Sequence, residues 1–490
     1  MNKKILISLL YLLILAGTAH AVLRVTDLRT EQLKNPLGID IRHPRLGWRI
    51  ESDEQNVMQT AYHILVASSP ELLAQGKGDC WDSGKVKTDA SQWITYQGET
   101  LKRNTPYYWK VKVYTHTNET DWSEPASWSM GLLNEADWQG QWIGLDRPAP
   151  GDSETQWSRL AARYLRKEFA LTKEVKRATV HIAGMGLYEL FINGQRIGEQ
   201  VLAPAPTDYR KTILYNTYDV TPQLQKENAI GVILGNGRFY TMRQNYKPYK
   251  IPTFGYPKLR LNLIVEYTDG SRQTIASDIS WKLTTEGPIR SNNEYDGEEY
   301  DARKELGDWN RTGYDDTNWI PAGRVSIPSG TLRAQMMPGM KVTESLKPVS
   351  IRKQGDKQIL DIGQNMAGWL RIRIKGQAGD SIRLRFAERL QPDGEIFTKN
   401  LRDAHCTDIY VVSGREPQDA TWAPRFVYHG FRYVEISGYP NAKTEDFTAE
   451  VVDDEMAHTG TFTCSDETLN QVLRNAFWGC LLYTSPSPRD

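Results

Sequence analysis

The clearest structural signal lies at residues 369–386, which read WLRIRIKGQAGDSIRLRF. Apolar side chains alternate with arginines in residues 369–374 and again in residues 381–386, and this period of two is typical of a strand that buries one face. The glycine-rich segment between them has the composition of a turn. Residues 407–412 and 431–436 are further strands of the same kind. The sequence therefore predicts a half-buried antiparallel sheet here.

Two hairpin signals occur further upstream. Residues 187–192 alternate and lead into Asn193-Gly194, and both of these residues tolerate the positive φ of a type I′ turn. Residues 259–267 alternate before Asp269-Gly270. No long stretch with a helical period interrupts this region, so residues 132–325 are predicted to form a jelly-roll sandwich.

The N-terminal region has the pattern of an immunoglobulin-like or fibronectin type III sandwich. Leu101, Thr105 and Tyr107 fit L-x(3)-T-x-Y, the tyrosine corner in which the tyrosine hydroxyl bonds to upstream backbone. Trp48 is then the expected core tryptophan, and WSEPASW at residues 122–128 resembles the end of a fibronectin type III module. We interpret this domain as a spacer.

A helix is predicted to begin near residue 465, where residues 465–479 read SDETLNQVLRNAFWG. Apolar residues recur at the i, i+3, i+4, i+7, i+8 spacing of an amphipathic helix. Ser465 is the expected N-cap, and two acidic residues follow in the first turn, where the helix dipole favours negative charge. The apolar stripe finds no partner in the remaining sequence.

The last eleven residues, 480–490, read CLLYTSPSPRD and do not continue this pattern. Their two Ser-Pro pairs cannot extend a helix, because proline lacks a donor and clashes with the preceding turn. The stretch resembles a translated sequencing adapter joined to a truncated gene, so we predict a non-native tail. The alternative is an ordinary frayed C-terminus.

The predicted fold class is therefore mostly β, with three β-sandwich or jelly-roll domains in series followed by the first helix of a helical domain. The predicted divisions are a signal peptide (1–21), an immunoglobulin-like or fibronectin type III sandwich (22–131), a jelly roll that is a candidate for sugar binding (132–325), a β-sandwich (326–454), a linker with the first helix (455–479) and the tail (480–490).

Composition excludes a polyanion partner. Lys+Arg and Asp+Glu both count 60, so the net charge is zero and no basic field exists to recruit nucleic acid or an anionic membrane. Residues 1–21 carry Lys3 and Lys4, an apolar run and an Ala19-His20-Ala21 cleavage site, which together predict export to the periplasm or the outside. The apolar run is too short to span a membrane in the mature chain.

The four cysteines, at positions 80, 406, 464 and 480, are widely scattered. None has the spacing of a zinc site, and a disulfide cannot be assigned among them.

Loop residues in the jelly roll are candidates for sugar contact. Asp208 and Tyr209 follow a proline-broken loop, while Asn236 and Arg238 lie in GNGR after an apolar strand. Polar and aromatic loops at the ends of sandwiches are common binding sites. The alternative is that they are turn residues. The 15 tryptophans would also suit sugar stacking, although tryptophan is equally a core residue of sandwiches.

Residues 292–301, which read NNEYDGEEYD, concentrate oxygen ligands of the kind that Ca²⁺ prefers. Asp296, Glu298 and Asp301 are the candidate ligands, although the stretch does not match an EF-hand loop. The alternative is a solvated turn in which the following Arg303 pairs with the acidic residues.

Catalytic signals are weak. Glu388 and Glu395 could form the carboxylate pair of a glycosidase, but a solvated hairpin explains them better. His405 and Cys406 are adjacent, and neighbouring residues on a strand point to opposite faces, so we discount a Cys/His nucleophile. No G-x-S-x-G or H-E-x-x-H motif occurs.

Four long motifs, in order, resemble those of bacterial α-L-rhamnosidases of the inverting glycoside hydrolase family 78 type, and the resemblance covers residues 25–479. They are IAGMGLYELFINGQRIGEQVLAPAPTDYRKTILYNTYDVT (182–221), EYDGEEYDAR (294–303), DIGQNMAGWLRIRIKGQAGD (361–380) and HGFRYVEISGY (429–439). The resemblance implies that β-domains precede an (α/α)6-barrel catalytic domain, whose first helix is the one beginning at Ser465. It also implies that the N-terminal domain binds rhamnose with calcium in some relatives.

The resemblance further implies hydrolysis of terminal α-L-rhamnose from glycans, with no required cofactor. The general acid and base would lie just after the first barrel helix, so no catalytic residue is assigned in this chain, and we predict that it hydrolyses no aryl rhamnoside. Relatives read PGWTDY and GNGWY where this chain has PAPTDY and GNGRFY, which puts sugar stacking there in doubt. The alternative function is a non-catalytic carbohydrate-binding and spacer assembly, and the helix disfavours an adhesin.

Overall fold

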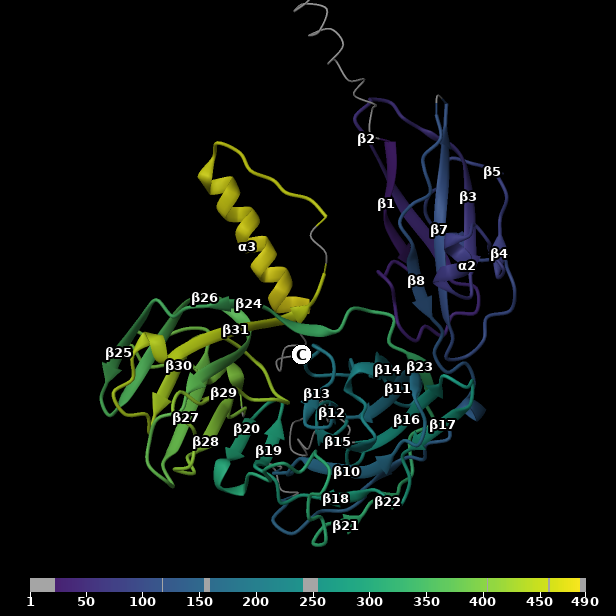
Figure 1. Cartoon of the computed structure of the whole chain (residues 1–490). Helices are drawn as coiled ribbons and strands as arrows, with labels where there is room; N and C mark the ends of the chain where they lie inside the picture. Colours follow the sequence, from purple (N-terminus) through teal and green to yellow (C-terminus); the bar gives the residue numbers. More distant parts are fainter. Residues whose placement is uncertain are drawn as a thin grey trace, which may run out of the picture. The chain divides into compact units, whose positions relative to one another are not determined.

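The computed structural model describes residues 23–116, 118–153, 159–240, 254–402, 404–456 and 459–484, and it consists mainly of β-strands (Figure 1). The chain divides into two compact units, Met1–Leu133 and Asn134–Asp490. Sheets dominate both units, which confirms the mostly β fold class. The predicted signal peptide lies outside the described residues.

The first unit contains a three-stranded and a five-stranded sheet. Strand β7 alternates between buried and half-buried side chains, as its sequence predicts. Trp48 is 1% exposed and packs edge-on against Tyr62 of the other sheet, so it is the core tryptophan that the sequence indicates. The strands are β1 (Leu23–Thr30), β2 (Arg45–Ser52) and β6 (Ile94–Thr95) in one sheet, and β3 (Gln59–Ala67), β4 (Trp81–Asp82), β5 (Val86–Lys87), β7 (Pro106–Thr115) and β8 (Ala126–Ser129) in the other, with the short helix α2 (Pro70–Ala74).

The predicted tyrosine corner is confirmed. The hydroxyl of Tyr107 accepts a hydrogen bond from the backbone N–H of Lys102 at 2.8 Å, and its ring stacks on Trp128 at 5.5 Å. The corner therefore ties the loop before β7 to the core of the unit.

Replacing Tyr107 by Phe should lower the free energy of unfolding of this unit by about 1 kcal/mol, because one hydrogen bond is lost while the packing stays. Urea unfolding followed by tryptophan fluorescence measures the change. Tyr114→Phe, which alters the opposite face of the same strand, is the matched control and should cost less. Equal losses in the two variants would show that the corner does not stabilise the unit.

The second unit begins with a jelly-roll sandwich. Leu190 and Val232 of one sheet share an apolar core with Val180 and Leu261 of the other. One sheet contains β13 (Gln195–Arg196), β12 (Leu187–Ile192), β15 (Glu227–Gly235), β10 (Arg163–Ala170), β18 (Lys282–Thr284) and β21 (Ile320–Pro321), and the other contains β22 (Gly323–Arg324), β9 (Ile143–Gly144), β16 (Lys258–Tyr267), β17 (Arg272–Ala276), β11 (Val175–Met185), β14 (Thr212–Asp219) and β23 (Thr331–Ala334).

Both predicted hairpins of this region form. Asn193 and Gly194 have φ angles of 51° and 83°, which is the geometry of a type I′ turn between β12 and β13. Strands β16 and β17 pair across the second turn, in which Gly270 has a φ of 81°.

A ten-stranded sheet follows in the same unit. Its strands are β19 (Ile289–Asn293), β20 (Gly297–Asp301), β28 (Thr407–Val411), β27 (Ser381–Ala387), β30 (His429–Ser437), β26 (Lys357–Arg373), β31 (Phe447–Asp454) and β24 (Met340–Leu346), with β25 (Ser350–Gln354) and β29 (Thr421–Trp422) paired to β26. Short 3-10 helices lie at η1 (Glu135–Asp137), η2 (Thr221–Gln223), η3 (Ala302–Lys304), η4 (Lys399–Leu401) and η5 (Thr444–Asp446).

Strand pairing crosses the predicted boundary between residues 325 and 326 in both directions. The hairpin β19–β20 precedes this boundary but joins the ten-stranded sheet through a parallel pairing of β20 with β28. Strand β23 follows the boundary but pairs with β14 of the jelly roll. One apolar cluster also runs from Tyr164 and Trp309 to Phe386 and Phe431. The jelly roll and the ten-stranded sheet are thus interlocked, and the predicted boundaries remain predictions.

The C-terminal helix α3 spans Glu467–Thr484 and packs against β26 and β31. Its cap differs from the prediction: the Asp466 carboxylate, not Ser465, accepts the N–H groups of Thr468 and Leu469, at 2.8 and 3.3 Å. An aspartate is as good a cap as serine, and its charge adds a favourable interaction with the helix dipole.

Helix α3 also continues past Gly479, where the sequence pattern predicted its end. A single glycine costs a helix only about 1 kcal/mol, and the Ser-Pro pairs begin only after Thr484. Leu469 and Val472 are 53% and 59% exposed, so these two members of the predicted apolar stripe face solvent. None of the helices in the described part of the chain has the length and hydropathy of a bilayer span.

Candidate functional site

The predicted sugar-binding residues lie close together, but the structure gives them unequal roles. Tyr209 is 2% exposed and packs edge-on against Phe239 and Phe254, with ring centroids 5.1 and 5.3 Å away. Asp208 is paired with Arg210 at 2.9 Å. Tyr209 is therefore a core residue, and Asp208 stabilises the turn to which it belongs.

Asn236 and Arg238 lie beside the hairpin of β19 and β20. The Asn236 side chain is 1% exposed and donates from Nδ2 to the backbone carbonyl of Asn292 at 2.9 Å. Its Oδ1 is buried and accepts no hydrogen bond from the described residues. Arg238 donates to the Tyr295 hydroxyl at 3.1 Å and pairs with Glu294 at 3.2 Å. Arg238 is thus the member of the set most available to a ligand that reaches this hairpin.

The predicted calcium ligands point to different partners. Asp296 accepts the N–H of His405 at 3.1 Å, and Asp301 pairs with Arg303 at 2.8 Å, as the alternative interpretation had it. Asp296 and Glu298 line one shallow hollow of about 370 Å³, whereas Asp301 does not. Within the described residues, no three His, Cys, Asp or Glu side chains gather as a metal site. Calcium binding remains a prediction.

Glu298 belongs instead to a buried polar network that sequence reasoning missed. Its carboxylate accepts the backbone N–H groups of Arg425 and Phe426, both at 3.1 Å from Oε2, and its own N–H donates to Asp408 at 2.9 Å. Asp408 also bonds the Nε2 of His429 at 3.0 Å. All three ionisable side chains are fully buried.

Cys406 completes this network. Its Sγ lies 3.3 Å from Nδ1 of His429, and the His429 ring stacks on Phe386 at 4.2 Å. The sequence directed attention to the adjacent His405, whereas the actual partner is 23 residues further along the chain. Cys406 is 4% exposed, so the thiol is enclosed rather than presented to a substrate.

Burial and charge shift the pKa values of this network in defined directions. Burial raises the pKa of Glu298 to about 8, and the negative charge of Asp408 adds to this despite the opposing backbone N–H groups. Burial alone would lower the pKa of His429, but the Asp408 carboxylate outweighs it and raises the value to about 10. His429 is therefore a cation and Glu298 mainly a neutral acid at pH 7.

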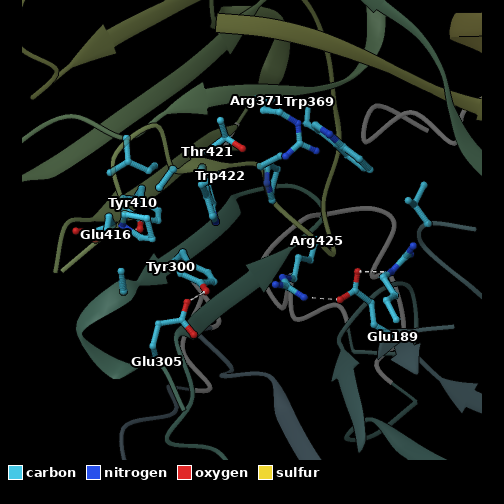
Figure 2. A pocket seen from close by; sticks show the side chains of 18 of the residues that line it. Glu189, Tyr300, Glu305, Trp369, Arg371, Tyr410, Glu416, Thr421, Trp422 and Arg425 are labelled. Atoms are coloured by element: carbon cyan, nitrogen blue, oxygen red, sulfur yellow. Dashed lines mark hydrogen bonds and ion pairs between the residues drawn. The ribbon is translucent and has the colours of Figure 1, made fainter. Parts of the chain in front are cut away.

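A cleft of about 1100 Å³ lies between the jelly roll and the ten-stranded sheet (Figure 2). Strands β12 and β13 supply Glu189 and Arg196 from one side. Strands β26 and β29 supply Trp369, Arg371 and Trp422 from the other. The interlocking of the two sheets therefore forms this cleft.

An aromatic cluster forms one wall of the cleft. Tyr300 and Tyr410 stack at 5.5 Å with an angle of 7° between their planes, which follows from the direct pairing of the two residues in β20 and β28. Trp422 packs against Tyr410 at 5.4 Å. The three side chains are 5–6% exposed, so they show edges rather than faces to the cleft.

Polar groups surround the open centre of the cleft, as Figure 2 shows. Arg425 pairs with Glu189 at 2.7 Å, and Glu189 raises the pKa of this guanidinium. The Tyr300 hydroxyl donates to Glu305, and the Tyr410 hydroxyl donates to Glu416 at 3.1 Å. Apart from the abundance of tryptophan, no sequence pattern indicates this arrangement.

Three family models match the chain. The immunoglobulin domain of the Rha78A-like N-terminus matches residues 25–134, the α-L-rhamnosidase N-terminal domain matches residues 173–344, and the concanavalin-like domain of bacterial α-L-rhamnosidase matches residues 351–453. The chain belongs to the bacterial α-L-rhamnosidase family. The sequence resemblance is thereby confirmed, and the first domain is an immunoglobulin-like one.

Relatives and solved structures agree with this assignment. An α-L-rhamnosidase of Formosa agariphila is 37% identical over 93% of this chain and 50% of its own length. The solved α-L-rhamnosidase of Dictyoglumus thermophilum is 39% identical, with a TM-score of 0.85 over 94% of this chain and 52% of that one. The Streptomyces avermitilis enzyme, solved in complex with L-rhamnose, is 29% identical, with a TM-score of 0.87 over 94% of this chain and 60% of that one. The chain spans about half the length of the curated relatives it matches.

Proposed function

We propose that the whole protein is an α-L-rhamnosidase that releases terminal α-L-rhamnose from glycans or glycosides with inversion. The single observation that supports this proposal is the match of three consecutive rhamnosidase domain models along one chain. An inverting glycosidase uses one carboxylic acid to protonate the leaving oxygen and one carboxylate to activate water, with about 6.5–9.5 Å between them. We place both carboxylates outside these 490 residues.

In this proposal the chain itself acts as a carbohydrate-binding and spacer assembly. Each of the four carboxylates that line the cleft is held by a protein donor: Glu189 by Arg425, Glu199 by Lys341, Glu305 by Tyr300 and Glu416 by the Ser413 N–H at 2.6 Å. Fixed ionised carboxylates suit hydrogen bonding to hydroxyl groups better than proton transfer.

The test is hydrolysis of p-nitrophenyl α-L-rhamnopyranoside. The whole protein should release p-nitrophenol, and proton NMR during the first turnovers should show β-rhamnose as the initial product, because inversion converts the α-anomer. The 490-residue chain should release none above the blank. Retention of configuration would contradict the proposed mechanism, and absence of turnover by the whole protein would contradict the activity.

We also propose that the loops carrying Asp208, Tyr209, Asn236 and Arg238 form a rhamnose-binding patch to which Ca²⁺ contributes, in which Arg238 contacts the sugar while Tyr209 and Asp208 stabilise their loop. Within the part of the chain that the structure describes, no donor reaches the buried Oδ1 of Asn236, and this supports the proposal because buried acceptors are almost always satisfied. Isothermal titration of the chain with L-rhamnose should show binding that weakens on addition of EDTA and is lost in Arg238→Ala. Unchanged heats in that variant would exclude the patch.

Export is the remaining part of the proposal. Residues 1–21 have the composition of a signal peptide, and the first domain would then act as an extracytoplasmic spacer of fibronectin type III kind. N-terminal sequencing of the protein recovered outside the cytoplasm should begin at Val22. A start at Met1 would contradict export by this route.

A further inference from the structure

Most charges of the cleft are paired within the protein. Five basic and four acidic side chains line it. Arg371 holds both oxygens of Glu450, at 2.6 and 2.9 Å, and Arg425 pairs with Glu189 at 2.7 Å. A charged ligand at either pair would have to break it to gain a counter-charge, so the near balance of charges in the lining favours a neutral polar ligand.

Both donors and acceptors line the cleft (Figure 2). Glu305 and Glu416 each accept a phenolic hydroxyl, and a carboxylate has further lone pairs that remain free to accept. The side chains of Arg371 and Arg425 are 40% and 37% exposed, so part of each remains accessible. A neighbouring acceptor and donor match the adjacent hydroxyl groups of a sugar ring.

The aromatic cluster makes this arrangement rigid. Tyr300 and Tyr410 are packed in parallel and braced by Trp422, and their hydroxyls fix the positions of Glu305 and Glu416. Groups that are already ordered before binding lose little conformational entropy when a ligand arrives. A polyhydroxylated ligand, which has weak individual contacts, benefits most from such preorganisation.

The size of the cleft indicates more than one sugar residue. Its volume of about 1100 Å³ slightly exceeds the range for small-molecule sites, about 300–1,000 Å³. A monosaccharide would leave much of it filled with water. The ligand that fits is an oligosaccharide.

We propose that this cleft is a binding site for a neutral oligosaccharide, separate from the patch around Arg238. The neutrality and size of the ligand follow from the cleft alone, whereas the use of a rhamnosyl sugar as the probe rests on the proposed function. The site holds the glycan and takes no part in bond cleavage.

The test uses the 490-residue chain carrying Arg238→Ala, so that the predicted patch does not contribute. Isothermal titration with rutinose, a neutral rhamnosyl-glucose disaccharide, should show saturable binding at least tenfold tighter than that of the anionic digalacturonate. Thr421 is exposed and lies in the cleft on the two-residue strand β29. The further change Thr421→Trp should fill the cleft and weaken rutinose binding at least tenfold.

Thr95→Trp is the matched control, because Thr95 is also an exposed threonine at the end of a two-residue strand, in the first unit. It should leave rutinose binding unchanged, and thermal unfolding should show both tryptophan variants folded. Absence of rutinose binding in the Arg238→Ala chain, unaltered binding after Thr421→Trp, or a preference for digalacturonate would each overturn the proposal. None of these outcomes bears on hydrolysis by the whole protein, which is assayed separately.

Discussion

Replacing Asp408 by Asn is expected to lower the free energy of unfolding of the second unit by about 3–5 kcal/mol at pH 7, the usual cost of breaking a buried ion pair. Asp408 and His429 are fully buried, 3.0 Å apart, and the carboxylate holds the imidazole as a cation. Asn keeps the shape of the side chain but removes the charge. His429 must then either remain as an unpaired buried cation or give up its proton.

The matched control is Asp82→Asn, because Asp82 also pairs with a histidine, His63, but at the surface. The Asp82 side chain is 57% exposed, and exposed pairs contribute only about 0–1 kcal/mol. Differential scanning calorimetry of the two variants measures both changes. A loss for Asp408→Asn as small as that for Asp82→Asn would show that the buried network does not stabilise the sheet.

The second large effect is expected in the pH dependence of stability. Burial raises the pKa of Glu298 to about 8, above the usual value of 4.5. The folded state thus favours the protonated form of Glu298. The contribution of Glu298 to stability is therefore fully present below about pH 4.5 and is lost as the pH rises towards 8. The loss over that interval is on the order of 4 kcal/mol.

Glu298→Gln should remove most of this dependence, because the amide is neutral at every pH. The variant should unfold at a temperature close to that of the unmodified chain at pH 5 and at a higher one at pH 9. A remaining decline is expected between about pH 6.5 and pH 10, because the raised pKa of His429 stabilises the folded state below this range and that contribution is lost as the pH rises to about 10. A decline between pH 5 and pH 8 as steep as in the unmodified chain would contradict the assignment of the proton to Glu298.

Local features were predictable from the sequence because neighbouring residues determine them. The Asn193-Gly194 turn needs only two residues that tolerate positive φ, and the tyrosine corner at Tyr107 bonds to backbone five residues away. The alternation in residues 369–386 likewise predicts the two strands β26 and β27, although β30 lies between them in the sheet. In each case the period or the turn chemistry alone decides the structure.

The cleft and the buried network were not predictable because their contacts are distant in the sequence. Glu189 and Arg425, which pair across the cleft, are 236 residues apart. Glu298 reaches the network only because β20 pairs in parallel with β28, and no local pattern specifies that partner. For the same reason the acidic run at residues 292–301 looked like a calcium loop, although its side chains face separate partners.

Burial also explains why the predicted sugar residues are unequal. Aromatic and amide side chains in a loop have the same sequence signature whether they fill a core or face a ligand. Tyr209 packs among phenylalanines, whereas Arg238 remains a quarter exposed beside Glu294. The Arg238→Ala substitution is therefore the clearest test of the rhamnose-binding patch.

The most direct test of the central proposal is to sequence the source DNA through the codon for Gly479 and to assay the product of the whole reading frame on p-nitrophenyl α-L-rhamnopyranoside. We expect a frame that continues into helical sequence with an acid-rich loop, a product that releases β-rhamnose, and no release by the 490-residue chain alone. Release of rhamnose by the 490-residue chain, with loss of activity on substitution of one of its own carboxylates, would contradict this proposal.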